Sequence, residues 1–337
     1  MKVVLYHSNC QDGFFAAATL YKKFGKEALY IPVNYKPIQD LTPEKALAYI
    51  FNPEYSEELF SKGNSLYTLK DVRPENYKDV NLFIVDYSFP VGHLEVYSKL
   101  FKSILTLDHH VTAVKAYGEK YLTGETKEGW LTMHPSENTK LVFSEKDSGA
   151  MLVHRYFNPE EPAPYFIELV SDRDLWQFKK KETDLFHYGV RLLNEENIQK
   201  VLDYATTNFE FILHLGELQK KEVLSRIKKT KRHGVFPVKI TLHGNDYKGA
   251  IVNSSLDIAS DLCSSVIKDG YDIAIAYSLQ SVENVSFSVR SAKGVDSSKL
   301  SLYFGGGGHA QASGFHASSK MLFEMMQTQS LTVPPYR

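Results

Sequence analysis

The sequence predicts an α/β fold: a mostly parallel sheet, then a helical region, then a second and smaller α/β domain. Short apolar runs alternate with amphipathic stretches through the first half of the chain. This is the pattern of buried parallel strands that are covered by helices on both faces. From about Asp147 to Lys229 the pattern becomes largely helical, and short strand patterns then return around one helix.

The predicted elements are short, as is usual for such a fold. In the first domain we expect strands over Val3–Tyr6, Ala28–Val33, Leu82–Val85 and Ile104–Leu107, and helices over about Gly13–Phe24 and Val91–Leu100. In the second domain we expect strands over Val238–Leu242, Tyr247–Val252, Ile273–Leu279 and Val285–Arg290, with a helix over about Asp257–Ile267.

A basic run marks the boundary between the two domains. Lys228–His233 is followed by Gly234, with Pro237 close behind, a combination typical of a helix end and a linker. We therefore predict a first domain over residues 1–229, a linker over 230–236 and a second domain over 237–337. The charges of the run are interpreted as a solvated helix end, and attraction of an anionic substrate is the alternative.

Composition restricts the function. The 337 residues suffice for two hydrophobic cores. With 39 basic and 40 acidic residues the net charge is -1, whereas proteins that grip long nucleic acids non-specifically usually carry a basic excess. A small or short anionic substrate in a local pocket is therefore expected.

Cysteine usage and hydropathy exclude other classes. The two cysteines cannot form a disulfide framework or a zinc cluster. No apolar run approaches the ~20 residues that span a bilayer, and no leader pattern is present at the N-terminus. We expect a cytoplasmic protein without membrane contact. A homodimer is compatible with the sequence, which does not decide the oligomeric state.

Acidic and imidazole side chains follow three of the predicted strands. They are His7 and Asp12 after the first, Asp86 after the third, and Asp108, His109 and His110 after the fourth. A single carboxylate in such a place is usually a helix cap or a turn residue. However, the carboxyl ends of parallel strands share one edge of the sheet, where ligands bind. We therefore expect these side chains to converge on one site.

The residue types indicate metal binding. Mixed carboxylate and imidazole ligands suit Mn²⁺, while Mg²⁺, Fe²⁺, Co²⁺ or Zn²⁺ are alternatives. Two such ions roughly 3.5–4 Å apart can activate a shared water and clamp a phosphate. This chemistry needs one carboxylate that bridges both ions, and Asp86, alone at its strand end, is our choice.

A glycine run near the C-terminus predicts an anion site. Gly305, Gly306, Gly307 and Gly308 are followed by His309. Glycine lets backbone N–H groups approach an anion without hindrance from Cβ, and Arg290 upstream can bind a phosphate bidentately. A flexible loop is the alternative interpretation.

A helix start after Asp147 is a further candidate. Ser148 opens a predicted helix, and the free N–H groups at such an end favour a phosphate. The alternative is a plain helix start.

These patterns together resemble the DHH phosphoesterases. Leu107-Asp108-His109-His110 contains the tripeptide that names that family. The other segments that look like its motifs are, in order, His7–Phe14, Val85-Asp86, Val170–Trp176, Val289-Arg290-Ser291 and Phe304–Ala310. A lone Asp-His-His is unspecific, but the motifs in order over nearly the whole chain are specific.

The resemblance implies roles for individual residues. His7, Asp12, Asp86, His109 and one aspartate of the fourth motif, Asp172 in preference to Asp174, would hold two metal ions. Asp86 would bridge the ions, Asp108 would orient His109, and His110 would face the substrate phosphate. Ser148, Arg290, Gly306, Gly307, Gly308 and His309 would bind the substrate. The second domain would close over the first, with the active site in the cleft between them.

One position departs from the family's pattern. Many members have two aspartates separated by one residue in the first motif, and here Cys10 replaces the earlier one. A thiolate is a soft ligand that suits zinc better than manganese. The other interpretation is that Cys10 is a small buried residue, which would leave the first metal with fewer ligands.

The resulting hypothesis is a metal-dependent phosphoesterase that hydrolyses small nucleotides or very short single-stranded oligonucleotides. It resembles the short-oligonucleotide hydrolases, which are exonucleases, more than the long single-strand exonuclease with its added domains. The alternative is an exopolyphosphatase or pyrophosphatase. A lesser alternative, prompted by Cys10, is a nucleotide-binding module without catalysis.

Overall fold

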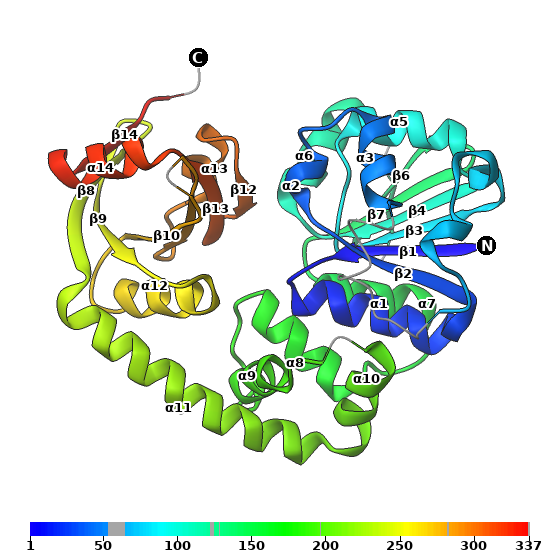
Figure 1. Ribbon diagram of the computed structural model, residues 1–337, viewed down its shortest axis with the longest axis horizontal. Coiled ribbons are helices and arrows are strands. Elements are labelled where there is room, and N and C mark those ends of the chain that lie inside the picture. Colours follow the sequence, from blue (N-terminus) through cyan, green and yellow to red (C-terminus); the bar gives the residue numbers. More distant parts are fainter. Residues whose placement is uncertain (53–64, 122–124, 128, 196, 282, 336–337) are drawn as a thin grey trace. The chain divides into compact units, whose positions relative to one another are not determined.

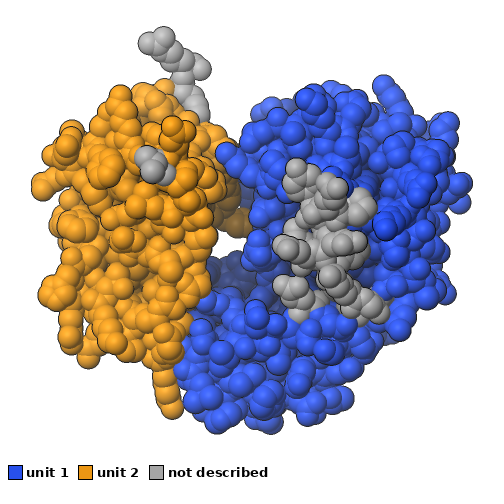
Figure 2. Space-filling model, viewed as in Figure 1, with its two compact units in different colours: residues 1–220 blue, residues 221–337 orange. Residues whose placement is uncertain are grey.

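The computed structural model describes residues 1–52, 65–121, 125–127, 129–195, 197–281 and 283–335. They form two compact units, Met1–Lys220 and Lys221–Arg337, drawn in blue and orange in Figure 2. Each unit contains its own sheet and its own hydrophobic core.

A seven-stranded sheet organises the first unit, in the order β2-β1-β3-β4-β7-β6-β5. Its strands are β1 (Lys2–His7), β2 (Ala28–Val33), β3 (Asn81–Val85), β4 (Ser103–Asp108), β5 (Glu125–Lys127), β6 (Trp130–Ser136) and β7 (Thr139–Ser144). The neighbouring pairs β2-β1, β1-β3, β3-β4 and β4-β7 are parallel. Strand β6 pairs antiparallel with both β7 and β5. The mostly parallel α/β fold predicted from the sequence is confirmed.

Helices cover both faces of this sheet (Figure 1). The helices up to the end of this unit are α1 (Gln11–Phe24), α2 (Tyr35–Ile38), α3 (Pro43–Ile50), α5 (Val91–Leu100), α6 (Val111–Lys120), α7 (Gly149–Phe157), α8 (Tyr165–Asp174), α9 (Thr183–Leu193), α10 (Ile198–Thr207) and α11 (Phe209–His233). Of these, α9 packs on α8 and α10 packs on α1 rather than on the sheet, and α11 continues into the second unit. Short 3₁₀ turns lie at Gly25–Glu27, Leu69–Asp71, Pro74–Asp79 and, in the second unit, Leu256–Ile258.

Each face of the sheet has a separate core. Val3 and Leu5 point to the face covered by α3, α5 and α6, whereas Val4 and Tyr6 point to the face covered by α1, α7 and α8. This alternation within one apolar strand follows from the two-residue period of β structure. Because both faces are buried, the strand reads as a continuous apolar run.

The strand order creates a binding edge. From β1 the chain crosses to β2 on one side and then returns to β3 on the other side of β1. The carboxyl ends of β1 and β3 therefore flank the point at which strand order reverses, where ligands bind in open α/β sheets.

The second unit is built on a mixed sheet in the order β12-β13-β11-β10-β9-β8-β14. Its strands are β8 (Val235–Leu242), β9 (Asn245–Asn253), β10 (Ile273–Leu279), β11 (Val285–Ser291), β12 (Gly307–His309), β13 (Ala312–Ala317) and β14 (Ser330–Val333). Its helices are α12 (Ala259–Ile267), α13 (Ser298–Tyr303) and α14 (Ser319–Thr328). The smaller α/β fold expected for this part is confirmed.

The expected linker differs in the structure. Helix α11 continues to His233 and β8 begins at Val235, so Gly234 alone separates them. Lysine and arginine are good helix formers, and Lys231 is held by an ion pair of 2.6 Å with Asp269. The basic run therefore extends the helix through most of the segment 230–236.

The expectation that no segment crosses a membrane can be tested for helices. Among the residues that the structure describes, no helix combines the length and apolar character needed to cross a bilayer.

Candidate metal centre

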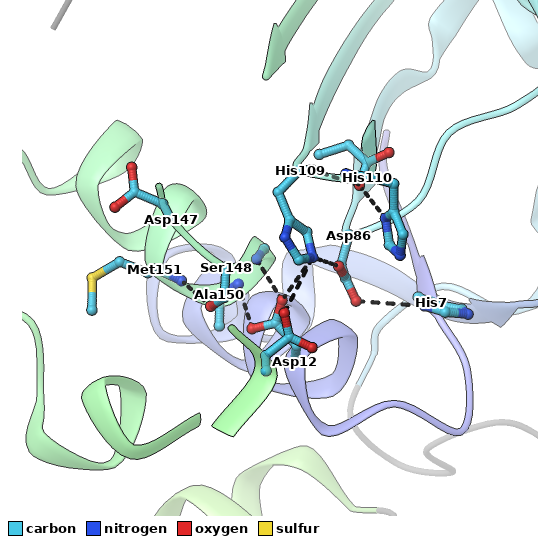
Figure 3. A network of polar contacts seen from close by, with 12 residues as sticks. His7, Asp12, Asp86, His109, His110, Asp147, Ser148, Ala150 and Met151 are labelled. Carbon is cyan, nitrogen blue, oxygen red and sulfur yellow. Dashed lines mark hydrogen bonds and ion pairs between the residues drawn. The ribbon is translucent and has the colours of Figure 1, made fainter. Parts of the chain in front are cut away.

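Four polar side chains gather at the carboxyl edge of the first sheet (Figure 3). His7 is the last residue of β1, Asp86 follows β3 directly, and His109 and His110 follow β4. Parallel register holds Tyr6 opposite Val85, and Val85 opposite Leu107, so the three strands end at the same level. The convergence expected from the strand ends is what the structure shows.

Two groups of potential metal ligands lie at this edge. Asp12, His109 and Asp174 form the first group, and their ligand atoms all lie within 4.8 Å of one another. His7, Asp86 and His110 form the second group under the same limit. In the first group, His109 Nε2 lies 3.6 Å from Asp12 Oδ2 and 3.4 Å from Asp174 Oδ2.

Asp86 connects the two groups. Its Oδ1 lies 3.1 Å from Nε2 of His109 in the first group, and its Oδ2 lies 3.6 Å from Nδ1 of His7 in the second. One carboxylate oxygen therefore faces each group. Asp86 also has a φ of 53°, a left-handed conformation that aspartate tolerates better than most residues. Such strain persists where surrounding structure holds it, typically at functional sites.

Several of these atoms are buried without a hydrogen-bond partner among the described residues. They are Nδ1 of His7, both carboxylate oxygens of Asp86 and Oδ2 of Asp174. Buried polar atoms are almost always hydrogen-bonded, because leaving one unpaired costs about 1–3 kcal/mol. Cations would satisfy these atoms, and carboxylates with imidazoles are the donor set of Mn²⁺. The residues fit a pair of divalent ions.

The charges of the cluster also favour cations. Burial, together with the neighbouring carboxylates, raises the pKa of Asp12 well above its ordinary value, and burial raises the pKa of Asp174. Burial would do the same at Asp86, but His109 and His7 outweigh it and lower the pKa of that carboxyl. Three acidic side chains thus share a buried space in which like charges repel.

The N-terminus of α7 anchors Asp12. The backbone N–H of Gly149 makes a short hydrogen bond to Asp12 Oδ2, and that of Ala150 donates to Oδ1 at 3.0 Å. The positive end of the helix dipole thereby stabilises this carboxylate. Gly149 also permits the approach, because a Cβ there would lie 2.6 Å from Cβ of Asp86 and 2.9 Å from Asp12 Oδ2.

Ser148 has a structural contact in place of the predicted contact with substrate. Its side chain is fully buried and accepts the N–H of Met151 at 3.4 Å as the cap of α7. The free N–H groups expected to bind a phosphate are instead bonded to Asp12. The substrate-binding role of Ser148 stays a prediction.

The fourth motif contributes Asp174 rather than Asp172. The carboxylate of Asp172 accepts the N–H groups of Lys179 and Lys180 at 2.9 and 3.1 Å and the hydroxyl of Thr183 at 2.5 Å. These bonds fix the turn between α8 and α9. Asp174, and not the preferred candidate Asp172, therefore lies among the potential metal ligands of the first group.

Asp108 holds His110, whereas we had expected it to orient His109. Its Oδ1 lies 2.7 Å from Nδ1 of His110, and the hydroxyl of Ser88 donates to its Oδ2 at 2.5 Å. Toward His109 it accepts only the backbone N–H, at 2.7 Å. Burial alone would lower the pKa of His110, but Asp108 raises it. The chain turns after Asp108, the last residue of β4, and Asp108 Oδ1 also accepts the backbone N–H of His110 at 3.3 Å, so the ring of His110 lies beside this carboxylate.

Cys10 belongs to neither ligand group among the described residues. It is the residue before α1, and burial, with added repulsion from Asp86, raises the pKa of its thiol well above the ordinary value. A protonated thiol is a poor metal ligand. Cys10 is therefore a half-buried residue outside both ligand groups rather than a ligand of either.

Two tyrosines at the site had no signal in the motifs. Tyr35 follows β2, and its ring centroid lies 5.4 Å from that of His7 and 6.0 Å from that of His110. Tyr87 follows Asp86 and packs against Tyr35 at 4.7 Å. The signal that could have found Tyr35 is its place at the end of a fourth parallel strand.

The predicted substrate residues of the second unit lie on the sheet itself. Gly307, Gly308 and His309 form edge strand β12, which pairs with β13, and Gly306 precedes it. Gly306 and Gly308 leave no room for a Cβ, which would lie 2.1 and 2.6 Å from backbone oxygens of β13. The second half of the glycine run therefore belongs to strand β12, while Gly305 and Gly306 form the turn before it.

Arg290 on β11 and His309 on β12 are aligned across the sheet, with strand β13 between them. Arg290 pairs with Ala312 on β13, and Ala312 pairs with His309 on β12. Directly opposed residues share one face of a sheet, so Arg290 and His309 flank a small alanine. The guanidinium of Arg290 donates to Ser260 Oγ and to the carbonyl oxygen of Val289, both at 2.8 Å.

Sequence comparison establishes no family. No family model matches the chain. The uncharacterized protein R106 of Acanthamoeba polyphaga mimivirus is 24% identical over 337 residues, which cover 93% of this chain and 66% of the relative. The chain thus spans about two thirds of the length of that relative.

Structural comparison finds distant likenesses over the whole chain. The pGpG-specific phosphodiesterase PggH of Vibrio cholerae has a TM-score of 0.44 and 13% identity, with 97% of this chain and 98% of that chain covered. An uncharacterized protein of Helicobacter pylori G27 has a TM-score of 0.40 and 16% identity, with 98% and 99% covered. TM-scores below 0.5 do not establish a common fold, so functional inference depends on the site itself.

Replacing the two aspartates of the fourth motif by asparagine, one at a time, distinguishes their roles. Asp174→Asn removes a crowded buried charge, so we expect the metal-free protein to keep or gain stability and to lose most of its Mn²⁺-induced rise in Tm. Asp172→Asn weakens three hydrogen bonds and should destabilise by about 1–3 kcal/mol, with the Mn²⁺ effect retained. Thermal unfolding with and without Mn²⁺ measures both, and the reverse pattern would restore Asp172 as the ligand.

Gly149→Ala tests the close approach of α7 to the cluster. The added Cβ must displace Asp86 or the helix, so we expect a loss of about 1–3 kcal/mol in stability and weaker Mn²⁺ binding. Gly118→Ala on α6 is the matched control, because a Cβ there meets nothing within 4 Å, and it should be neutral or stabilising by up to about 1 kcal/mol. Equal behaviour of the two variants in thermal unfolding and in metal titration would contradict the packing argument.

The raised pKa values of Asp12 and Asp174 predict that Mn²⁺ binding depends on pH. A raised pKa means that the metal-free site still holds protons where ordinary carboxylates have lost them, and the metal must displace these protons. Affinity should therefore fall on acidification, by up to about tenfold per pH unit for each proton displaced. Calorimetry in two buffers of different protonation enthalpy measures proton release, and release of no protons at any pH would contradict the charges assigned here.

Proposed function

We propose that the protein is a divalent-metal-dependent phosphoesterase that hydrolyses small nucleotides or very short single-stranded oligonucleotides. The observation that carries the proposal is the position of the Asp86 carboxylate. Its Oδ1 faces His109, in the group with Asp12 and Asp174, and its Oδ2 faces His7, which belongs with His110 to the group of Asp86 itself. A bridging carboxylate between two hard cations is what hydrolysis of a phosphate ester by two metals needs.

The described residues offer potential ligands for two metal positions. We assign Asp12, His109 and Asp174 to one ion and His7 and Asp86 to the other, with Asp86 shared. Manganese is the metal proposed first, because of its preference for carboxylates and imidazoles. Such ions supply a nucleophilic hydroxide at neutral pH and withdraw charge from the phosphate.

His110 is proposed to face the substrate phosphate. One ring nitrogen is fixed by Asp108 at 2.7 Å, and the ring belongs to the group formed with His7 and Asp86. Because Asp108 raises its pKa, His110 can carry a proton and donate it in a hydrogen bond to a phosphate oxygen. A donor placed where negative charge develops stabilises the transition state.

The second unit is proposed to hold the end of the substrate that is not cleaved. Arg290 and His309 offer cationic and hydrogen-bonding groups on one face of the sheet, with the small residue Ala312 between them. Two donors across a shallow, small-residue surface suit a phosphate or a terminal nucleotide. Closure of the second domain over the first stays a prediction.

Substitution of the bridging residue tests the reaction. Asp86→Ala and His109→Ala should each lower kcat/KM for a 5′-phosphorylated dinucleotide with Mn²⁺ by at least ~10³-fold, about 4 kcal/mol in the barrier. Asp246→Ala is the control, since that carboxylate pairs with Lys239 on a hairpin of the second unit. Near-normal turnover by either site variant would overturn the assignment.

A substrate panel decides between nucleotides and inorganic polyphosphate. We expect mononucleotide release from 5′-phosphorylated dinucleotides, pGpG among them, that slows as the strand lengthens. Phosphate release from polyphosphate with inertness toward every nucleotide would establish the exopolyphosphatase alternative. Binding of a dinucleotide without turnover, whichever divalent metal is supplied, would indicate a binding module.

A further inference from the structure

The segment directly after Asp174 has an unusual backbone. Trp176 and Phe178 have φ values of 56° and 50°, in the left-handed region that bulky side chains rarely adopt. Glycine or asparagine would form the same turn without strain. Two large aromatic residues at such positions indicate that the side chains themselves are needed there.

The two rings are organised around one arginine. The guanidinium carbon of Arg173 lies 5.1 Å from the ring centroid of Trp176 and 5.2 Å from that of Phe178. The rings also contact each other edge to face, with centroids 4.9 Å apart. Arg173 is in turn fixed by Asp184, whose Oδ1 it contacts at 2.7 Å. The aromatic pair is therefore held in one arrangement before any ligand arrives.

The turn that carries the pair is fixed as well. The N–H groups of Gln177 and Phe178 both donate to the carbonyl oxygen of Asp172, at 2.9 and 3.4 Å. The carboxylate of the same Asp172 accepts the N–H groups of Lys179 and Lys180. These bonds explain why Asp172 is not available to a metal, and they make the segment rigid.

The outer side of the segment is open and basic. Phe178 remains 40% exposed, and Lys179 and Lys181 beside it are exposed. The side chain of Lys181 is 90% accessible. Aromatic rings interleaved with cations are the usual surface for single-stranded nucleic acid, since each base offers a face for stacking and each phosphate a negative charge.

We propose that Trp176 and Phe178, the aromatic platform, stack a nucleobase of a substrate whose phosphate is held at the metal centre. The proposal rests on the proposed function and deepens it, because it selects nucleotides over inorganic phosphates. Two residues span at most about 7 Å of backbone. The backbone of Trp176 therefore lies no farther than this from that of Asp174, a distance comparable to the length of one nucleotide. Lys179 and Lys181 would attract the neighbouring phosphate.

Kinetics with a base-free substrate tests the platform. The wild type should prefer a 5′-phosphorylated dinucleotide over its abasic analogue, and Phe178→Ala should reduce that preference in kcat/KM about tenfold, as expected for the loss of stacking on one base. Phe211→Ala is the matched control, because Phe211 is 46% exposed and likewise contacts one ring, that of Tyr204. An unchanged preference in Phe178→Ala would overturn the proposal and leave the phosphoesterase assignment intact.

Fluorescence supplies a readout that does not depend on catalysis. The chain has two tryptophans, so Trp130→Phe leaves Trp176 as the sole source of tryptophan fluorescence. With Ca²⁺ in place of Mn²⁺, we expect the dinucleotide to quench this emission and the abasic analogue to leave it within about 10%. Absence of quenching at saturating dinucleotide would overturn the platform. Quenching by a protein that hydrolyses no nucleotide would support the platform and overturn the proposed function.

Discussion

The first unit is organised around three carboxylates, two buried and one half-buried, that converge on one imidazole. Asp12, Asp86 and Asp174 all lie within 3.6 Å of Nε2 of His109. Burying several like charges costs far more than ordinary packing recovers, unless cations or aligned dipoles compensate. The structure provides one such dipole, the N-terminus of α7, and leaves both carboxylate oxygens of Asp86 and Oδ2 of Asp174 without hydrogen-bond partners among the described residues. Positive charge at this edge would therefore stabilise the fold.

That constraint explains features that are otherwise separate. Gly149 is required because the helix end must approach within contact distance of Asp86. Asp108 is required because it fixes His110 beside the cluster. The parallel register of β1, β3 and β4 is required because it brings their ends to one level. Each of these features serves the charged site, and the strand register serves the two hydrophobic cores as well.

The sequence predicted the strands and the ligands of the first motifs because these depend on local order along the chain. It could not choose between Asp172 and Asp174. The two lie about 200° apart around α8 at 3.6 residues per turn, so only one can face the sheet, and packing decides which.

The sequence patterns also did not predict β5–β7 and β12–β14. The glycine run has no apolar pattern, and β6 is mostly half-buried, so neither shows the alternation by which strands are recognised.

Backbone strain distinguishes residues that only shape the fold from residues near the candidate metal centre. Non-glycine residues with positive φ, in the described part of the chain, are Asn9, Asp86, Trp176, Phe178, Asn194, His243 and Gln329. The last three end helices or turn the β8–β9 hairpin, where this conformation is common. The first four lie in or directly beside the segments that carry the motifs, and each is a candidate ligand or lies close in sequence to one. Helix ends and the hairpin explain the other three, so the remaining strain gathers around the candidate metal centre.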